Sequence, residues 1–518
     1  MRIIDARTLN EAHCVESDVA IVGAGAAGLT LALTLSRLDP NLAISIIELG
    51  GMAADAETDS LRKVVNVGRP CGILPRSTTS CVGGATHLWG GHCVPIRPYC
   101  FDKRNWIADS EWPIKSKELI PFYERAHALL GLGDFDYEPQ SVLAGAPFTL
   151  FNGLGSEVET TVSKYQPGSL AQTCVPELKS RENVSLYLHA YACRLVATEN
   201  GRAVTHIEMR SSIEKGWSLK SKRVVVAAGG IENARLLLAS ECALPGGFGN
   251  QHDLVGRYFM EHIWYQSGLL EFRDTSKSFA IYETIHQHPE GYGVRTHISL
   301  SGSACEKLRI PGFRAELSNP DLETASEQKP TGARLLEELM LPGNLSAYTK
   351  GVRTQPGVHL SEEKRQKHSN RLFLSNYTEQ VPNPSSTVTL SKHKNALGES
   401  LAQLDWQLSS IDVEGIERAH QQIEQAFAKA GIADFRYLQG EFDKSLAGAD
   451  GGGHHMGTTR MHSSPSHGVV DENCKVHDMD NLYIAGSSVF PSAGYANPTL
   501  TIVAMAIRLG YNLATNTQ

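Results

Sequence analysis

Residues 19–38 read VAIVGAGAAGLTLALTLSRL, which is a short apolar run, a glycine-rich turn and a segment with helical spacing. A second apolar run, AISIIEL at 43–49, follows the pair Asp39-Pro40. The residue before a proline is restricted to extended backbone, so this pair predicts the end of the helix. The order strand, turn, helix, strand predicts a βαβ unit with buried parallel strands.

The glycines of this turn have the spacing of a dinucleotide-binding fingerprint. Gly23 is suited to the tight turn, Gly25 to close approach of a pyrophosphate, and Gly28 to close packing of helix and strand. Glu48 ends the next strand, where a carboxylate can accept ribose hydroxyl protons and disfavours a 2′-phosphate. The motif therefore predicts dinucleotide binding at the N-terminus of the helix, with FAD and NAD both open.

The same strand-turn-helix order recurs at two distant places in the chain. KRVVVAAGG at 222–230 leads into the helix-like IENARLLLAS, and NLYIAGSSVF at 481–490 precedes the apolar helix that Pro498 can begin. Between them, residues 262–440 mix β-rich stretches with polar loops and one amphipathic helix. We therefore expect a dinucleotide domain that is assembled from separate segments and interrupted by a second domain.

The predicted fold class is α/β. It has a Rossmann-like nucleotide-binding domain built from discontinuous segments and an inserted α+β substrate domain built on a β-sheet. The nucleotide domain is assigned to residues 1–100, 190–261 and 451–518. The substrate domain is assigned to residues 101–189, partly connecting helices and loops, and 262–450.

Composition excludes several classes of function. The net charge of −8 over 518 residues provides no general basic field, so we expect no nucleic-acid partner. The ten cysteines are scattered without a C-x-x-C pair, which favours reduced thiols in a cytoplasmic protein. No run reaches eighteen apolar residues and the N-terminus lacks an apolar signal segment, so we expect neither a membrane span nor export.

Two glycine-rich turns near the C-terminus carry polar side chains suited to a reaction centre. GGGHHMGTTRMH at 451–462 places His454 beside His455, and AGYANPTLTI at 493–502 places Asn497 before a helix. A neutral imidazole can accept a hydroxyl proton near neutral pH, and an amide can hold a substrate oxygen. A zinc site is the alternative for the histidines, but no further ligands stand at close spacing, so we expect no metal. For Asn497 the alternative is a structural turn residue.

These segments together resemble the glucose-methanol-choline (GMC) oxidoreductases, particularly their pyranose-oxidase-like and bacterial sugar dehydrogenase branches. The resemblance covers most of the chain. Besides VAIVGAGAAG it includes SCVGGATHLWGG at 80–91, VVVAAGGIENARLLLAS at 224–240, LVGRYFMEH at 254–262, EQVPNPSSTVTL at 379–390, HHMGTTRM at 454–461 and NLYIAGSSVFPSAGYANPTLTI at 481–502.

The resemblance implies FAD as the cofactor and oxidation of an alcohol CH-OH group by hydride transfer to flavin N5. In the family's H-x-x-G-T pattern the catalytic base corresponds to His454, and the second polar partner, His or Asn, corresponds to Asn497. His455 is the runner-up. The implied cofactor contacts are Gly23, Gly25, Ala26, Ala27, Gly28, Glu48, Gly83, Gly84, Trp89, Gly90, Ala228, Gly229, Gly486, Asn497, Pro498 and Thr499.

Departures from the family pattern shape the remaining expectations. Some members attach FAD through a histidine four residues after the GG pair, where this chain has Leu88, so we expect non-covalent FAD. His87 either lines the cavity over the flavin or packs within its loop. Glu379 and Gln380 are candidates to face the substrate, with a solvated loop as the alternative. Thr387 replaces the family's usual arginine, and nothing in the sequence explains that change.

The expected substrate is a sugar, an aminosugar, a polyol or a glycoside, as in the branches that the chain resembles. A non-sugar alcohol, or a flavoprotein lyase with no net redox turnover, are the alternatives within the same scaffold. A nucleotide-binding regulator without catalysis is disfavoured because His454 and Asn497 both match the family pattern. The electron acceptor is open between oxygen, a quinone and a redox protein, and an oligomer is possible.

Overall fold

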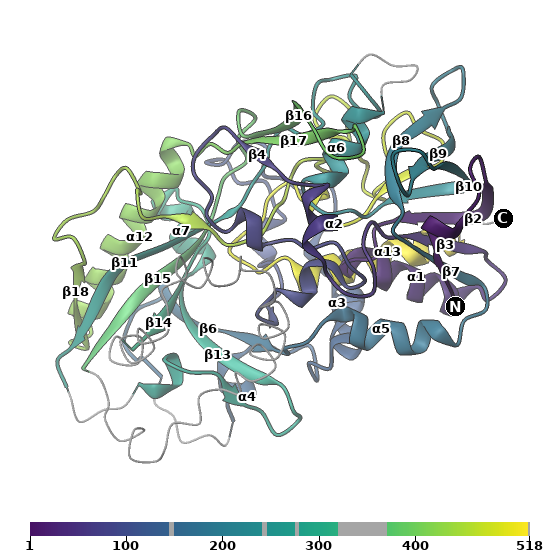
Figure 1. Ribbon diagram of the computed structural model, residues 1–518. Coiled ribbons are helices and arrows are strands. Elements are labelled where there is room, and N and C mark those ends of the chain that lie inside the picture. Colours follow the sequence, from purple (N-terminus) through teal and green to yellow (C-terminus); the bar gives the residue numbers. More distant parts are fainter. Residues whose placement is uncertain (145–149, 241–245, 275–278, 320–369, 516–518) are drawn as a thin grey trace.

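The fold is described from a computed structural model of the 518-residue chain (Figure 1). The described residues are 1–144, 150–240, 246–274, 279–319 and 370–515. Residues 320–369, which belong to the predicted substrate domain, and Cys242 lie outside this description. Both chain ends lie on the side of the molecule that carries the first βαβ unit (Figure 1).

The first βαβ unit lies in an eight-stranded sheet with a parallel centre. Strands β1, β7, β3, β2 and β10 pair in parallel, and β20 also pairs in parallel with β10. Strands β9 and β8 extend the other edge in antiparallel order. In spatial order the strands are β1 (Arg2–Asp5), β7 (Val184–Leu188), β3 (Ile44–Ile47), β2 (Cys14–Val22), β10 (Gly216–Val226), β9 (Val204–Arg210) and β8 (Tyr191–Ala197), with β20 (Leu482–Ile484) beside β10.

Two helices from opposite ends of the chain pack together beside this sheet. Helix α1 (Ala26–Leu38) follows the glycine turn, and α13 (Thr499–Thr515) is the last described helix. A Cβ atom on Gly510 would lie 2.7 Å from Thr34 Cγ2, so glycine lets the two helices approach closely. The C-terminal helix thus packs directly on the helix of the first βαβ unit.

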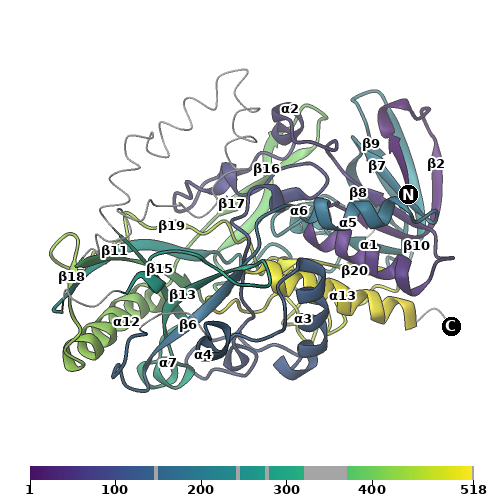
Figure 2. The same cartoon turned by 90° about the horizontal axis from the view of Figure 1, so that it is seen from below.

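A nine-stranded sheet forms the other half of the molecule (Figure 2). Its path is β18 (Ala433–Tyr437), β11 (His262–Phe272), β15 (Arg371–Glu379), β14 (Phe313–Ser318), β13 (Gly293–Leu300), β6 (Val158–Tyr165) and β5 (His92–Cys93), with β12 (His286–Gln287) beside β13 and β19 (Asp450–Gly451) beside β11. Helix α12 (Ser410–Lys429) buries Ala419, Ile423 and Phe427 in the core of this sheet. The predicted amphipathic helix is thereby confirmed.

A small third sheet and several short helices complete the described fold. The sheet contains β16 (Thr387–Lys394), β17 (Ser400–Asp405) and β4 (Val65–Asn66), and the first two contact α6 (Glu232–Ala239). The remaining α-helices are α2 (Ala56–Ser60), α3 (Ser116–Leu130), α4 (Pro139–Val142), α5 (Leu170–Lys179) and α7 (Gly302–Leu308). Helix α3 is followed by Gly131, which caps it in the left-handed conformation with φ +68°.

The predicted α/β class is confirmed by this mixture of parallel and antiparallel sheets with packed helices. The boundaries of the two domains stay a prediction. One predicted strand differs in extent, because β10 begins at Gly216 instead of Lys222 and ends at Val226. Its first residues pair with β9 as well as with β2, and this pairing extends the strand beyond the apolar run. Among the described helices, none is both long and apolar enough to cross a membrane.

Candidate active site

The glycine turn after β2 has the geometry that its sequence predicted. Gly23 has φ +109°, and a Cβ atom there would lie 2.5 Å from the Ala227 carbonyl oxygen. A Cβ on Gly28 would lie 1.9 Å from the Gly23 oxygen, so helix and turn pack in contact. At Gly25 a Cβ would meet no atom within 4 Å, because this residue faces open space. The turn thus has two tightly packed glycines and one that leaves room for a ligand.

Glu48, at the end of β3, is buried beside this turn. Its Oε2 accepts a hydrogen bond from Ala24 N over 3.0 Å, and its Oε1 accepts one from Gly50 N, also over 3.0 Å. Burial raises the pKa of the Glu48 carboxyl, while these two backbone donors oppose the rise. Each oxygen retains a lone pair that can accept a ligand hydroxyl.

A cavity of about 510 Å³ joins the glycine turn to the C-terminal polar residues. It is lined by Gly25 and Glu48 as well as by His454 and Asn497. The other predicted cofactor residues on its wall are Gly23, Ala26, Ala27, Gly84, Trp89, Gly90, Ala228, Gly229, Gly486, Pro498 and Thr499. A Cβ on Gly229 or Gly486 would also meet no atom within 4 Å. At these glycines the cavity wall consists of backbone without side chains, which suits an extended ligand that lies close to the main chain.

His87 and Gly83 are not part of the described cavity wall. The imidazole Nε2 of His87 lies 2.8 Å from the Val82 carbonyl oxygen and 3.1 Å from Ser169 Oγ. Gly83 packs against Ser169 and His87, since a Cβ there would lie 2.4 Å from Ser169 Oγ and 2.7 Å from His87 Nε2. Of the two placements considered for His87, the structure has the one within its own loop.

Glu379 and Gln380 lie buried behind the described cavity wall. Glu379 forms a bidentate ion pair with Arg104, with N–O distances of 2.6 and 2.7 Å, and both side chains are almost fully buried. Gln380 Oε1 accepts hydrogen bonds from Glu261 N and Trp406 Nε1, each over 2.9 Å. Both groups are engaged by protein partners, so neither is placed in a solvated loop.

His454 and Asn497 meet at one end of the cavity. Asn497 Nδ2 lies 3.3 Å from His454 Nε2, and Asn497 Oδ1 accepts a hydrogen bond from Arg314 Nη1 over 3.1 Å. The Arg314 contact requires the oxygen of the amide to face the guanidinium, because a guanidinium only donates. The amide N–H therefore points at His454, whose Nε2 carries a lone pair.

Two consecutive buried residues, Glu261 and His262, hold the other sides of His454. His262 begins β11, and its Nδ1 lies 2.7 Å from His454 Nδ1. Glu261 Oε1 accepts hydrogen bonds from His454 N over 2.5 Å and from His262 N over 3.0 Å. Burial, with smaller effects of His262, Arg314, His455 and His92, holds the pKa of His454 well below its usual value of 6.5. The imidazole is therefore neutral at neutral pH.

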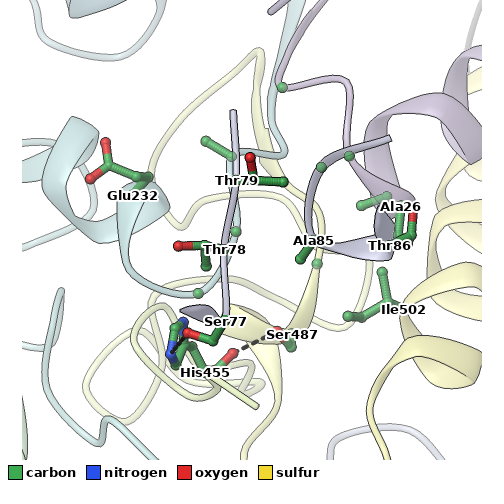
Figure 3. Close-up of a pocket in the computed structure, with 18 of the residues that line it drawn as sticks. Ala26, Ser77, Thr78, Thr79, Ala85, Thr86, Glu232, His455, Ser487 and Ile502 are labelled. Atoms are coloured by element: carbon green, nitrogen blue, oxygen red, sulfur yellow. Dashed lines mark hydrogen bonds between the residues drawn. The ribbon is translucent and has the colours of Figure 1, made fainter. Parts of the chain in front are cut away.

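His455 points toward Ser77 (Figure 3). Its Nε2 lies 3.2 Å from Ser77 Oγ, and its carbonyl oxygen accepts a hydrogen bond from Ser487 Oγ over 2.6 Å. Burial, with Arg62 nearby, lowers the pKa of His455 to about 4. The runner-up histidine thus also lines the cavity and is also neutral.

The structure adds polar residues that sequence reasoning did not single out, and four of them belong to the surroundings of His454 and Asn497. They are His92 and Tyr377 on the cavity wall and His262 and Arg314 behind it. Burial lowers the pKa of His92 to about 4, and Arg314 lies over the ring of Tyr377 at 5.1 Å. His262 ends the quoted segment LVGRYFMEH, so a signal was present there. The other three sit in strands without a recognisable motif.

In the part of the chain that the structure describes, no cluster of three or more His, Cys, Asp or Glu side chains could hold a metal ion.

Comparison with known proteins relates the chain to one family. Residues 382–506 match the GMC oxidoreductase family's C-terminal domain. The 2-methyl-1,2-propanediol dehydrogenase of Mycolicibacterium austroafricanum is 24% identical over 83% of this chain and 80% of its own length. The 6'''-hydroxyparomomycin C oxidase of Streptomyces lividus is 24% identical over 96% of this chain and 91% of its own length.

A solved structure shares the fold along nearly the whole chain. Pyridoxine 4-oxidase from Mesorbium loti superposes with a TM-score of 0.60 at 15% sequence identity. The match covers 97% of this chain and all of the pyridoxine 4-oxidase chain. At this identity the likeness concerns the fold alone.

Proposed function

Because this chain belongs to the GMC oxidoreductases, whose C-terminal domain it carries at residues 382–506, we propose that it oxidises the CH-OH group of an alcohol with FAD as cofactor. His454 is the base and Asn497 its partner in this proposal. Oxidation of an alcohol removes a hydride from carbon and a proton from oxygen, so the site needs an electron acceptor and a base.

The pair of His454 and Asn497 is the observation that carries the proposal. A hydroxyl group needs an acceptor for its proton and a donor for its oxygen lone pairs. The Nε2 lone pair of His454 and the Nδ2–H of Asn497, 3.3 Å apart on the cavity wall, offer both. These two groups are complementary to a substrate hydroxyl, and His454 gains its proton as the carbonyl forms.

The residues of the cavity fit FAD. Gly25, Gly229 and Gly486 leave open space where a Cβ atom would project, and the carboxylate of Glu48 lies beside the glycine turn. The first N–H groups of α1 have no partner within the helix, so they can donate to a pyrophosphate. When bound, FAD supplies the acceptor for the hydride that leaves the carbinol carbon.

The chain's own residues account for the proton and the charge. His454, held neutral by burial, accepts the hydroxyl proton at Nε2. Asn497 donates to the substrate oxygen and carries no charge of its own. The buried Arg314 guanidinium, hydrogen-bonded to Asn497 Oδ1, keeps the amide nitrogen on the side of His454 Nε2, from where it can donate to the substrate oxygen. Pro498 and Thr499 place the N-terminus of α13 on the cavity wall, where its dipole favours negative charge.

The proposed substrates are sugars, aminosugars, polyols and glycosides. The relatives' names support this breadth, since they include oxidases of 6'''-hydroxyparomomycin C and paromamine and dehydrogenases of fructose and 2-methyl-1,2-propanediol. His92 and Tyr377 line the same cavity as His454 and offer hydrogen-bonding groups to a polyhydroxylated molecule. A small diol is the non-sugar alternative.

FAD is proposed to bind without a covalent bond. Leu88 stands at the family's attachment position, and the neighbouring His87 binds its own loop. Acid precipitation should therefore release all yellow colour into the supernatant, whereas a yellow pellet would indicate attachment.

The enzyme is proposed to work in the cytoplasm. The scattered cysteines of the sequence support this proposal, because they are typical of reduced thiols in a reducing compartment.

The decisive experiment is anaerobic flavin absorbance while alcohols are added to the purified holoprotein. The panel is D-glucose, D-fructose, paromamine, 2-methyl-1,2-propanediol and pyridoxine. Bleaching by one class identifies the alcohol, and rapid recolouring on admission of air then indicates an oxidase, slow recolouring a dehydrogenase. A flavin that stays oxidised with every alcohol, while the protein converts a cyanohydrin, would replace the proposal with a lyase.

A further inference from the structure

His262 connects His454 to a backbone carbonyl through two hydrogen bonds. Its Nε2 lies 2.8 Å from the Gly494 carbonyl oxygen, and its Nδ1 lies 2.7 Å from His454 Nδ1. The His262 side chain is fully buried, and the two imidazole planes are nearly perpendicular at 84°. Both contacts are well within hydrogen-bonding distance, so each needs one proton between its two atoms.

The direction of both hydrogen bonds follows from the carbonyl. An amide carbonyl oxygen accepts and never donates, so His262 Nε2 carries the proton toward Gly494. A neutral imidazole has one N–H, and His262 Nδ1 is therefore an acceptor. The contact with His454 then requires the proton to be on His454 Nδ1. In a neutral His454, that placement leaves Nε2 unprotonated, with its lone pair on the side of Asn497 Nδ2.

We propose that His262 is a positioning residue that holds the proton of His454 on Nδ1 and so makes Nε2 the base of the reaction. The inference rests on the proposed function for what Nε2 does, but the tautomer itself follows from the hydrogen bonds. When Nε2 accepts the substrate proton, the resulting imidazolium still donates from Nδ1 to His262, which stabilises the charge.

The charges around the two rings agree with neutral histidines. Burial, partly offset by the Gly494 bond, lowers the pKa of His262 to about 4, with Arg314 lowering it and Glu379 raising it. His454 faces His262, Arg314, His455 and His92, all of which oppose a positive charge on it. Glu261 Oε1 accepts from the backbone N–H groups of the two histidines and Oε2 lies 3.7 Å from His455 Nε2, so none of these contacts involves the facing Nδ1 atoms. No carboxylate therefore shares the proton between the rings.

A purely structural role is the competing explanation for His262. Its carbonyl oxygen also accepts a hydrogen bond from Gly452 N over 2.9 Å, and a Cβ on Gly452 would lie 3.3 Å from His262 Cβ. The ring could likewise serve only to brace the turn before Asn497, through the hydrogen bond of Nε2 to the Gly494 carbonyl oxygen. The two roles depend on different ring nitrogens, so they can be separated by substitution.

Asparagine and glutamine each replace one of the two ring nitrogens. In His262→Asn, the amide oxygen falls near the place of Nδ1 and can still accept from His454, but it cannot reach Gly494. In His262→Gln, the amide nitrogen falls near the place of Nε2 and can still donate to Gly494, but His454 loses its acceptor. His262→Leu removes both contacts, and the retention of FAD colour checks the folding of each variant.

The first measurement is the rate of anaerobic flavin reduction by whichever alcohol of the panel bleaches the wild type. We expect His262→Asn to stay within a few fold of the wild type. We expect His262→Gln and His262→Leu to be slower by roughly 10- to 100-fold, as for other partners that orient a reactive histidine. A bracing role reverses the order, with His262→Gln close to wild type and His262→Asn impaired, and that result would overturn the proposal.

The second measurement needs no substrate. Solid-state NMR of protein labelled with ¹⁵N-histidine distinguishes a protonated ring nitrogen from an unprotonated one, and the spectrum of His454→Ala assigns the His454 signals. We expect His454 in the wild type and in His262→Asn to show a protonated Nδ1 and an unprotonated Nε2. The opposite pattern in the wild type would sink the inference even if alcohols reduce the flavin. The expected pattern without any alcohol oxidation would instead contradict only the proposed function.

Discussion

Asn497 and His454, which are 43 residues apart in the chain, face each other over 3.3 Å between the amide nitrogen and Nε2. They come from two glycine-rich turns, one after β19 and one before α13, and both line the same cavity. Each is held from behind by a buried residue of the nine-stranded sheet, Asn497 by Arg314 and His454 by His262. The orientation of the pair thus depends on strands that do not border the cofactor fingerprint.

Replacing His454 with alanine should slow flavin reduction by about 100-fold or more while FAD stays bound, because the substrate hydroxyl loses its base. Stopped-flow absorbance under anaerobic conditions measures the rate. The exposed His393 is the matched control, and His393→Ala should leave the rate unchanged. A His454→Ala enzyme that reduces its flavin at a near-normal rate would move the role to His455.

Arg314→Met should slow flavin reduction by roughly 10-fold or more, because the Asn497 amide loses the charged donor that sets its orientation. Arg295→Met is the control, since Arg295 pairs with the same carboxylate, Glu316, and has no described contact with Asn497. Equal losses in the two variants would mean that the total positive charge matters and the amide orientation does not.

Gly25→Val should yield folded protein that no longer retains FAD. A Cβ at this position meets no protein atom within 4 Å, so the side chain fills only the space of the ligand. Gly216→Val, at the exposed start of β10, is the control and should stay yellow. The test is the ratio of flavin to protein absorbance after purification, together with circular dichroism. Yellow Gly25→Val protein would exclude this turn as the pyrophosphate site.

The rate of flavin reduction should be constant from pH 8 down to pH 6.5. The base must be neutral, and burial lowers the pKa of His454 well below 6.5, so its neutral form persists into more acid solution. An unshifted histidine would already lose half of the rate at pH 6.5. Rapid-mixing rates measured across this range with a saturating alcohol distinguish the two profiles.

The free energy of unfolding should decrease between about pH 4.5 and pH 8 through Glu261. Burial raises the pKa of this carboxyl from 4.5 to about 8, so in this window the folded protein holds a proton that the unfolded chain releases. Glu261→Gln cannot titrate, and its melting temperature should fall less than that of the wild type between pH 5 and pH 8. The exposed Glu441→Gln is the control and should follow the wild type.

Local patterns predicted the nucleotide half of the fold well. The run at 19–38 became β2, the glycine turn and α1, and the run at 43–49 became β3. These predictions succeed because glycine conformation and helical spacing act over a few residues, so the cause lies within the segment itself. Most predicted cofactor residues line one cavity for the same reason, since each belongs to a turn that follows a strand or begins a helix.

Predictions for side chains in the substrate half were less informative, because there the outcome depends on distant partners. Glu379 lies next to Gln380 in a family motif. The position of the Glu379 side chain is nevertheless set by Arg104, which is 275 residues away in the chain and forms a buried bidentate ion pair with the Glu379 carboxylate. A buried carboxylate needs such a partner, and no local pattern names it. The same limit applies to His92 and Tyr377, which reach the cavity only through strand pairing.

The sequence by itself determined the dinucleotide turn, the α/β class and the candidacy of His454 and Asn497, since each of these depends on residues close together in the chain. Only the tertiary structure decided which nitrogen of His454 carries the proton and which way the Asn497 amide faces. Those choices depend on the Gly494 carbonyl, His262 and Arg314, which come from three separate segments. Hydrogen-bond direction is a property of atoms brought together in space, and folding alone brings these atoms together.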